Sequence, residues 1–301
     1  MSDFDFSDKV AIVTGAGGGL GRAHALGFAS RGAKVVVNDL AAKDGSTAMA
    51  DAVVAEIVAA GGEAMVHGAN VAAMDQVEDM VAKTMDKWGR IDFLINNAGI
   101  LRDKSFVKGS LEDFKLVVDV HLMGSVNCTK AVWDIMREQN FGRIVMTSSS
   151  SGLYGNFGQS NYGAAKMAVV GFMNTLAQEG AKYNVRVNSL APAAATQMTE
   201  GLIPEDAMAL LEPEKVTPAV LFMCGENAPT RTIICAAAGG FATTRIYETK
   251  GMYLDEENRT PEGIAANWDT ISSGDDQVEC QSGAEQTVKF VSMALEAMGA
   301  K

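Results

Sequence analysis

Short apolar runs that alternate with helical segments constrain the fold of this 301-residue chain more than any other feature. Runs such as Ala33–Asn38 (AKVVVN) and Arg143–Ser148 (RIVMTS) are rich in β-branched and apolar residues and show no regular apolar–polar alternation. Strands of this kind are buried on both faces, as in a parallel sheet covered by helices. The sequence therefore predicts an α/β fold with a doubly wound parallel sheet between two layers of helices.

We expect seven strands in this sheet, with helices in the connections between them. The predicted strands are Lys9–Thr14, Ala33–Asn38, Glu63–His67, Ile91–Asn96, Arg143–Ser148, Val185–Leu190 and Arg231–Ala236. The predicted helices run from the turn after the first strand to about Ser30, then over Ala48–Ala60, Met74–Trp88, Leu111–Gln139 and Ser160–Tyr183.

The character of the chain changes after about Phe241. Segment Asp255–Gln281 is polar and acidic, and Thr260-Pro261-Glu262 has the composition of a helix start. Thr287–Met298 has the pattern of a final amphipathic helix. We therefore expect a main domain over residues 1–245 and a C-terminal appendage over 246–301. The appendage is too small to fold alone, so we expect it to pack on the main domain or on a neighbouring subunit.

The charge balance and the cysteines exclude several classes of protein. Twenty-five basic and 37 acidic residues give a net charge of −12, which argues against a nucleic-acid partner or an anionic membrane surface. No apolar run reaches the ~18 residues that span a bilayer, and the N-terminus lacks the pattern of a secretory signal. Four widely spaced cysteines and three scattered histidines predict reduced thiols, no metal site and a cytoplasmic location.

A glycine-rich turn joins the first predicted strand to the first helix. Its sequence is Thr14-Gly15-Ala16-Gly17-Gly18-Gly19-Leu20-Gly21. Leu20 stands where the strict G-x-G-x-x-G pattern needs its last glycine, so the pattern is T-G-x-x-x-G-x-G through Gly15, Gly19 and Gly21. A strand, such a turn and a helix N-terminus place backbone N–H groups on a phosphate. This predicts a dinucleotide site.

Asp39 ends the second predicted strand, 24 residues after Gly15. An acid at about this distance hydrogen-bonds the ribose 2′-hydroxyl of NAD and repels the 2′-phosphate of NADP. No basic residue occurs at Leu40, Ala41 or Ala42. The sequence therefore favours NAD, although Asp39 as an ordinary turn residue is the competing interpretation.

Tyr162 and Lys166 are four residues apart, so on a helix they share one face. A free tyrosine has a pKa of ~10, and an ammonium ~4 Å away would lower that pKa by up to about three units. Tyr162 would then act as a general base on an alcohol. Alone, Y-x-x-x-K is also the pattern of an amphipathic helix with a buried Tyr and a solvated Lys.

Together with Asn96-Asn97-Ala98-Gly99, these motifs resemble the short-chain dehydrogenase/reductase family, whose fold is of the Rossmann type. The resemblance implies that Tyr162 is the proton donor and acceptor and that Lys166 lowers its pKa and holds the nicotinamide ribose. Ser149, thirteen residues before Tyr162, would position the substrate oxygen. Asn97, Ala98 and Gly99 would line the cofactor groove.

Further residues fall at positions that the family uses. Asn70-Val71 occupies the place of a usual Asp-Val pair that contacts adenine, and Pro192 and Thr196 fall in the nicotinamide-side loop. His121 replaces an Asn that helps to hold a water leading from the lysine to solvent. A proton relay through His121 and a purely structural histidine are both open.

Within the family, the chain is most similar to the (3R)-hydroxyacyl-CoA dehydrogenase units of the peroxisomal multifunctional enzymes of β-oxidation. The similarity lies in NNAGILRDKSF (96–106), VHLMGS (120–125), IVMTSSSSGLYGNFGQSNY (144–162) and the tail segment TPEGIAANW (260–268). It implies NAD-dependent oxidation of a (3R)-3-hydroxyacyl-CoA by a stand-alone homodimer or homotetramer. Arg102, Lys104 and Lys108 would contact CoA phosphates, or else form a solvated loop.

Three alternatives stay open. The runner-up function is that of a hydroxysteroid dehydrogenase of the 17β type, or a steroid side-chain-CoA dehydrogenase. A 3-oxoacyl-carrier-protein reductase fits less well, because it would prefer NADPH and lack the tail. A non-catalytic NAD-binding scaffold is the third, although intact Ser149, Tyr162 and Lys166 argue against it.

Overall fold

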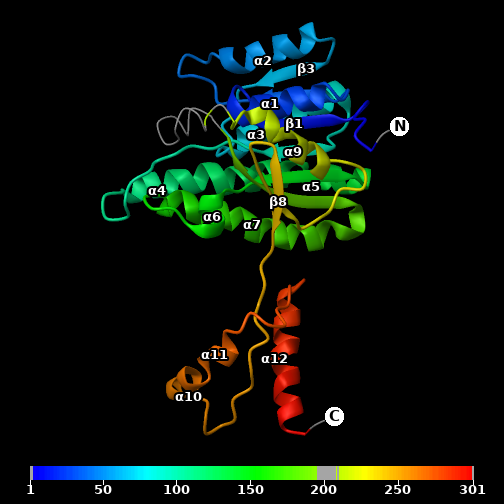
Figure 1. Ribbon diagram of the computed structural model, residues 1–301. Coiled ribbons are helices and arrows are strands. Elements are labelled where there is room, and N and C mark those ends of the chain that lie inside the picture. Colours follow the sequence, from blue (N-terminus) through cyan, green and yellow to red (C-terminus); the bar gives the residue numbers. More distant parts are fainter. Residues whose placement is uncertain (1–2, 195–207, 209, 300–301) are drawn as a thin grey trace. The chain divides into compact units, whose positions relative to one another are not determined.

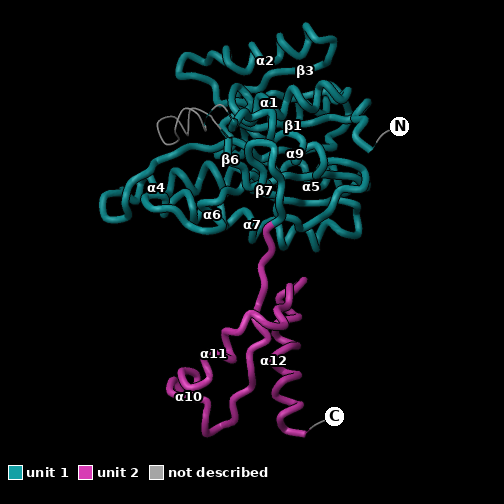
Figure 2. The backbone as a smooth tube through the Cα atoms, viewed as in Figure 1, with its two compact units in different colours: residues 1–243 teal, residues 244–301 magenta. Residues whose placement is uncertain are grey.

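The computed structural model describes residues 3–194, 208 and 210–299. The chain divides into two compact units, residues 1–243 and 244–301 (Figure 2). No helix within the described ranges is long and apolar enough to cross a bilayer.

Eight strands of the described chain form one sheet in the order β3-β2-β1-β4-β5-β6-β7-β8 (Figure 1). The strands are β1 (Val10–Thr14), β2 (Lys34–Asn38), β3 (Ala64–His67), β4 (Phe93–Asn96), β5 (Gly142–Thr147), β6 (Val185–Ala193), β7 (Ile233–Ala237) and β8 (Gly240–Thr244). Strands β1 to β7 pair in parallel. The predicted doubly wound α/β fold is confirmed, but the predicted strand count of seven is wrong.

The additional strand β8 follows β7 after a turn of two residues, Ala238 and Gly239. Both have positive φ, +50° and +82°, as in a type I′ turn. Only antiparallel strands can be joined by so short a connection. Most of β8 is exposed to solvent, so it lacks the continuous apolar run that marks the buried strands and that allowed the other strands to be predicted.

Helices cover both faces of the sheet. In the first unit they are α1 (Gly19–Ala29), α2 (Ala48–Ala59), α3 (Met74–Trp88), α4 (Leu111–Val118), α5 (Gly124–Gln139), α6 (Ser150–Tyr154), α7 (Ser160–Gly180) and α9 (Thr217–Met223). Side chains of α1, α2 and α9 form one buried cluster with the sheet, and side chains of α3, α5 and α7 form the other.

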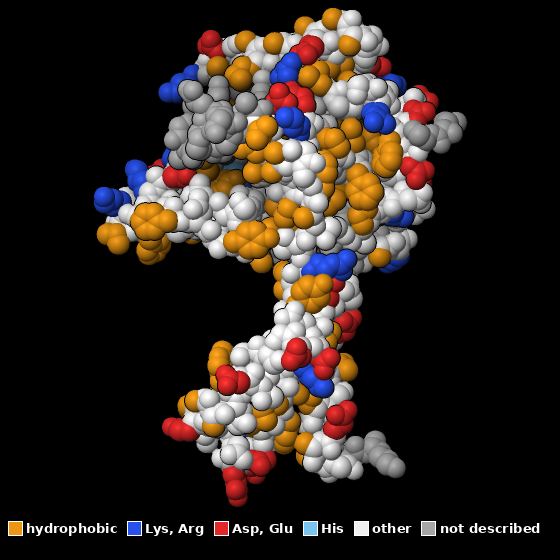
Figure 3. Space-filling model, viewed as in Figure 1, with side chains coloured by type: hydrophobic (Ala, Val, Ile, Leu, Met, Phe, Trp, Pro, Cys, Tyr) orange, Lys and Arg blue, Asp and Glu red, His pale blue; other side chains and the backbone are white. Residues whose placement is uncertain are grey.

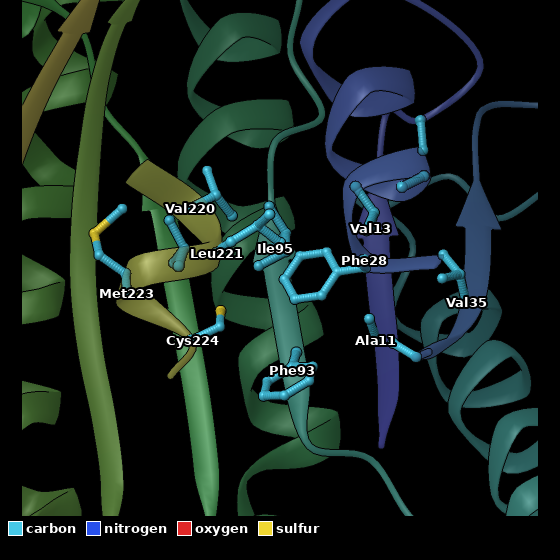
Figure 4. Close-up of a cluster of buried hydrophobic side chains, with 14 of the residues drawn as sticks. Ala11, Val13, Phe28, Val35, Phe93, Ile95, Val220, Leu221, Met223 and Cys224 are labelled. Atoms are coloured by element: carbon cyan, nitrogen blue, oxygen red, sulfur yellow. The ribbon is translucent and has the colours of Figure 1, made fainter. Parts of the chain in front are cut away.

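Alternation along each strand divides the core between these two clusters. On β1, Ala11 and Val13 face the cluster under α1, whereas Ile12 faces the opposite one. Figure 4 shows Phe28 of α1 lying against β4, where its ring stacks on that of Phe93 at a centroid distance of 5.2 Å. The sheet is thus buried on both sides, as the apolar strands predict.

The predicted helix Leu111–Gln139 contains a π-helical turn, Asp119–Met123, between α4 and α5. Such turns insert an extra residue into a helix and occur often at functional sites. Gly124 follows this turn, and a Cβ there would lie 2.6 Å from Val71 Cγ2. The turn carries His121, which is almost completely buried.

The second unit contains α10 (Pro261–Ala266), α11 (Trp268–Ile271) and α12 (Gly283–Ala297). Helix α10 begins as expected, since Thr260 caps it by accepting a hydrogen bond from the backbone N–H of Gly263 at 3.0 Å. Val288, Val291 and Leu295 lie on one face of α12 and are exposed.

The strand order reverses at β1, whose neighbours are β2 and β4. In open α/β sheets, ligands bind beyond the carboxyl ends of the strands at such a switch point. The polar residues singled out from the sequence follow these strand ends, so the topology gathers them at one edge of the sheet.

The turn between β7 and β8 provides a test of the fold. Ala238→Asn should stabilise the first unit by about 0.5–1 kcal/mol, because asparagine tolerates the left-handed conformation better than alanine and Asn-Gly favours a type I′ turn. Thermal unfolding of the variant measures this. A lower unfolding temperature would show that the two residues do not form this turn.

Candidate active site

The glycine turn after β1 is packed too closely for other residues. Gly15 has a φ of +62°, and a Cβ on Gly21 would lie 2.1 Å from the carbonyl oxygen of Gly15. Gly19 also has positive φ and begins α1, whereas Leu20 turns partly into the core. The first N–H groups of a helix have no partners within it, so this end of α1 offers donors for a phosphate.

The turn after β4 closes onto the glycine turn through Thr14. The Thr14 hydroxyl accepts hydrogen bonds from the backbone N–H groups of Asn97 and Ala98, both at 3.0 Å, and donates to the Ile95 carbonyl. The Asn97 side chain donates to the carbonyls of Thr14 and Gly15 at 2.9 and 3.1 Å. The NNAG segment therefore fixes the glycine turn, a role that the groove-lining prediction did not include.

Asp39 lies at the end of β2 beside the same turn. Its Oδ2 accepts a hydrogen bond from the Gly17 N–H at 2.7 Å, and its Oδ1 accepts one from the Leu40 N–H. A Cβ on Gly17 would lie 2.6 Å from Asp39 Oδ2. The carboxylate and the glycine turn thus form one cradle, and these residues fit an adenine dinucleotide.

The remaining predicted cofactor positions lie on neighbouring elements. Asn70 is half-buried, and its Oδ1 accepts a hydrogen bond from the Ala72 N–H. Val71 is buried, and its carbonyl accepts a hydrogen bond from the Asn127 side chain. Pro192 is half-buried near the carboxyl end of β6. Thr196 lies outside the described residues.

Ser149 and Lys166 come together at the end of β5. Ser149 caps α6, where it accepts a hydrogen bond from the Ser151 N–H. Lys166 on α7 is only 4% exposed, and its Nζ donates to the Thr147 carbonyl at 2.6 Å. The Ser148 hydroxyl in turn donates to the Lys166 carbonyl at 2.7 Å. The strand end therefore holds the lysine at both its backbone and its ammonium group.

Tyr162 lies between these groups on α7. Its phenol is hydrogen-bonded to Ser149. The Lys166 Nζ lies 5.6 Å from the centre of the Tyr162 ring. The spacing of four residues thus places both side chains on one face of α7, as expected.

The pKa values of this pair differ from the expectation. Burial raises the pKa of Tyr162, the hydrogen bond to Ser149 opposes this, and the charge of Asp103 adds to the rise. Burial lowers the pKa of Lys166 to about 7. The predicted lowering of the tyrosine pKa by the lysine is therefore wrong for the protein alone, because burial disfavours the charged form of both groups.

His121 holds the turn after NNAG. Its Nε2 lies 2.8 Å from the carbonyl oxygen and 3.1 Å from the amide nitrogen of Ile100. Its ring meets the Tyr162 ring edge-on, with 5.2 Å between the ring centroids. A Cβ on Gly99 would lie 2.3 Å from the His121 ring, so that glycine is required here. Among the described residues, Nδ1 is buried without a hydrogen-bond partner.

The neutral form of His121 is strongly favoured. Burial and the charge of Lys166 lower its pKa to about 3, although the bond to Ile100 opposes the shift. One ring nitrogen cannot donate to the carbonyl and accept from the amide at the same moment, so His121 satisfies one Ile100 group at a time.

Arg102 and Lys104 lie on the loop before α4 and share one acidic partner. Arg102 Nε is 3.6 Å and Lys104 Nζ 3.8 Å from the carboxylate of Asp113. Both side chains are exposed. Figure 3 shows basic and hydrophobic side chains side by side over this loop. A polyanionic ligand would therefore meet cations that Asp113 partly neutralises.

Comparison with known proteins identifies the family. A family model described as short chain dehydrogenase matches residues 9–207. The chain belongs to the short-chain dehydrogenase family. It is an oxidoreductase that acts on CH–OH groups. It is 46% identical to the peroxisomal multifunctional enzyme A of Dictyostelium discoideum, over 99% of this chain and 66% of that protein.

Solved structures that are similar to the chain include two that align with most of it. The full-length peroxisomal multifunctional enzyme type 2 of Drosophila melanogaster has a TM-score of 0.82 and 40% identity, over 97% of this chain and 50% of its own. A short chain dehydrogenase from Mycobacterium avium has a TM-score of 0.78 and 38% identity, over 89% of this chain and 95% of its own. The chain thus spans only part of the multifunctional relatives.

The close packing of the glycine turn gives a testable prediction. Gly21→Ala should abolish nucleotide binding and lower the unfolding temperature, because its Cβ would collide with the Gly15 carbonyl. Gly283→Ala is the matched control, since a Cβ there meets no atom within 4 Å. Calorimetric titration with NAD+ measures binding. Undiminished affinity in Gly21→Ala would contradict the assignment of this turn.

His121→Asn tests the histidine. An asparagine amide can donate to the Ile100 carbonyl and accept from its N–H at once, so activity should remain within about fivefold of wild type. His121→Ala should lose more. A large and equal loss in both variants would indicate that the imidazole itself is needed.

His121→Asn should also change how the free energy of unfolding depends on pH on the acid side. Unfolded histidine takes up a proton below about pH 6.5, whereas folded His121 stays neutral to about pH 3, so wild type loses stability as the pH falls through this window. From about pH 7 to about pH 5 the loss due to His121 is about 2 kcal/mol. The free energy of unfolding in urea should therefore fall less between about pH 7 and about pH 5 for His121→Asn than for wild type. An equal fall in both proteins would contradict the buried neutral state of His121.

Proposed function

We propose that the protein oxidises a (3R)-3-hydroxyacyl-CoA to the 3-oxoacyl-CoA with NAD+ as the acceptor. The observation that carries this proposal is the grouping of Ser149, Tyr162 and Lys166 beyond β5, beside the turns after β1 and β4. The similarity to multifunctional enzymes over nearly the whole chain supports the substrate class.

The cofactor would be held by the glycine turn and Asp39. Donors at the start of α1 would take the pyrophosphate, and the Asp39 carboxylate would accept hydrogen bonds from the adenosine ribose. The same carboxylate disfavours a 2′-phosphate, which supports NAD over NADP. Bound there, the nicotinamide would supply a hydride acceptor for C3 of the substrate and a positive charge beside the site.

Tyr162 would remove the proton of the 3-hydroxyl group while Ser149 holds the same oxygen by a hydrogen bond. In the protein alone, burial keeps Tyr162 protonated, and the pKa of Lys166 near 7 leaves that side chain only partly charged at neutral pH. A positive charge beside the pair favours the phenolate, because it offsets the cost of a buried anion. Lys166 then faces Tyr162 from one turn along α7 and would stabilise the phenolate as it forms.

His121 would hold neighbouring segments in place rather than transfer a proton. A pKa of about 3 makes protonation of its ring costly at neutral pH, and Nε2 is already engaged with Ile100. These features favour a structural histidine over a proton relay. Its contacts with Ile100 and Tyr162 would keep the loop after β4 in place against α7.

Arg102, Lys104 and Lys108 would receive the CoA phosphates at the entrance of the site. The first two would have to exchange Asp113 for phosphate, which limits the gain in affinity. We further propose a homodimer or homotetramer, in which the main domain or a neighbouring subunit would cover the apolar face of α12.

A panel of NADH-forming assays tests the proposed function. Activity is expected with (3R)-hydroxyacyl-CoAs of several lengths, with NAD+ preferred over NADP+. A 17β-hydroxysteroid should react more slowly or not at all. Activity with the (3S) epimers alone would contradict the proposal, and a faster reaction of the steroid would replace the substrate class.

Asp39→Asn serves as the cofactor control in the same panel. It removes a charged acceptor of hydrogen bonds, so kcat/KM for NAD+ should fall by about 10- to 100-fold while that for NADP+ does not fall. An equal fall for both would mean that Asp39 does not discriminate between them.

A further inference from the structure

The segment that leads into α7 contains a buried glutamine that the proposed reaction does not use. Gln159 lies three residues before Tyr162 and is only 8% exposed, although glutamines are mostly on protein surfaces. It stands at the N-cap of α7 but makes no side-chain cap hydrogen bond. Its side-chain amide instead makes hydrogen bonds to segments around the candidate active site.

The Gln159 amide joins two segments on the substrate side of the site. Its Oε1 accepts hydrogen bonds from the Ser151 hydroxyl at 2.7 Å and from Asn156 Nδ2 at 3.1 Å. Its Nε2 donates to Asp103 Oδ2 at 2.7 Å. Ser151 is two residues after Ser149 in α6, and Asp103 lies on the loop after β4. One buried side chain therefore connects the α6 segment, the start of α7 and the loop.

Two more hydrogen bonds repeat this link. The Lys104 N–H donates to the Gly158 carbonyl at 2.9 Å. Asn161 Nδ2 donates to the Arg102 carbonyl at 3.1 Å, while Asn161 Oδ1 accepts from the Tyr162 N–H at 2.7 Å. Residues 102–104 are thus fastened to residues 158–161, and we call this set of contacts the clasp.

The clasp determines where two exposed apolar segments stand relative to Tyr162. Phe106 and Val107 follow it on the loop and are 73% and 95% exposed. Phe157, on the other side of the clasp, is 91% exposed. Such residues beside Lys104 suit a ligand with an apolar chain and an anionic head. Opening the clasp would separate the two segments without removing either Ser149 or Tyr162.

We infer that Gln159 is a positioning residue for substrate, which acts by holding Asp103 and the loop after β4 against the start of the catalytic helix α7. The inference rests on the proposed roles of Ser149 and Tyr162. It predicts that breaking the bond between Gln159 and Asp103 raises KM for the substrate and leaves kcat close to wild type.

Reversing the bond tests this directly. Gln159→Glu keeps an acceptor for Ser151 and Asn156 but sets a carboxylate against Asp103, so KM should rise by about tenfold or more. In the double variant Gln159→Glu with Asp103→Asn, the new asparagine amide donates to the new carboxylate. The double variant should return KM to within about threefold of wild type.

Asp103→Asn alone separates the bond from the charge. The asparagine carbonyl still accepts from Gln159, so KM should change little. Among the residues that the structure describes, the charged or titratable groups that bear on the Tyr162 phenol are Lys166 from α7, His121 from the π-helical turn and Asp103 from the loop. Removing the Asp103 charge lowers the pKa of Tyr162, so the rise of kcat/KM with pH should move to lower pH. This shift reports the charge of Asp103, whereas the KM of Gln159→Glu reports the hydrogen bond.

KM, kcat and the unfolding temperature are measured for wild type, the two single variants and the double variant. The substrate is the secondary alcohol that wild type oxidises best. High KM in Gln159→Glu, rescue in the double variant and unfolding temperatures within a few degrees support the inference. Wild-type KM in Gln159→Glu, or a double variant no better than Gln159→Glu, overturns it. Tyr162→Phe in the same assay separates this inference from the proposed function. If Tyr162→Phe retains full activity, the proposed function fails. If Tyr162→Phe loses activity but Gln159→Glu has the KM of wild type, only the positioning role of Gln159 is overturned.

Discussion

The burial of one lysine is the constraint on which the site depends. Lys166 is enclosed by α7 and the end of β5, and its ammonium group has the Thr147 carbonyl as its hydrogen-bond acceptor. A buried amine with a pKa near 7 costs stability, since the unfolded chain would hold the proton more firmly. Proteins retain such groups where function needs them. The hydrogen bond from Ser148 to the Lys166 carbonyl and the close packing of α6 keep the group in this costly position.

The sheet topology explains why the other residues gather around the lysine. Parallel strands bring their carboxyl ends to one edge, and the reversal of strand order at β1 leaves room there for a ligand. Thr14 and Asn97 then tie the turns after β1 and β4 into one unit. Gly99 of the second turn packs against the His121 ring, which in turn meets the ring of Tyr162, so the cofactor cradle and the catalytic group are linked through one set of contacts.

The sequence predicted the parts of this arrangement that depend on local patterns. Continuous apolar runs located β1 to β7, the glycines located the turn, and the four-residue spacing placed Tyr162 beside Lys166. Strand β8 was missed because its residues are exposed, and the π-helical turn at His121 was missed because it depends on packing between distant segments. The direction of the tyrosine pKa was wrong for a similar reason, since burial is a property of the assembled fold. Gln159 carried a weak signal at most, as nothing local shows that its partner is Asp103, 56 residues away.

The central claim is that burial keeps the Tyr162 phenol protonated in the protein alone, and that the positive charge of bound NAD+ lowers the pKa of this phenol. An ultraviolet titration of tyrosinate, taken as the difference between wild type and Tyr162→Phe, measures this with and without NAD+. The account predicts that Tyr162 ionises above the ordinary value of ~10 in the protein alone and at lower pH with NAD+ bound. Ionisation at the ordinary value in both states would contradict it.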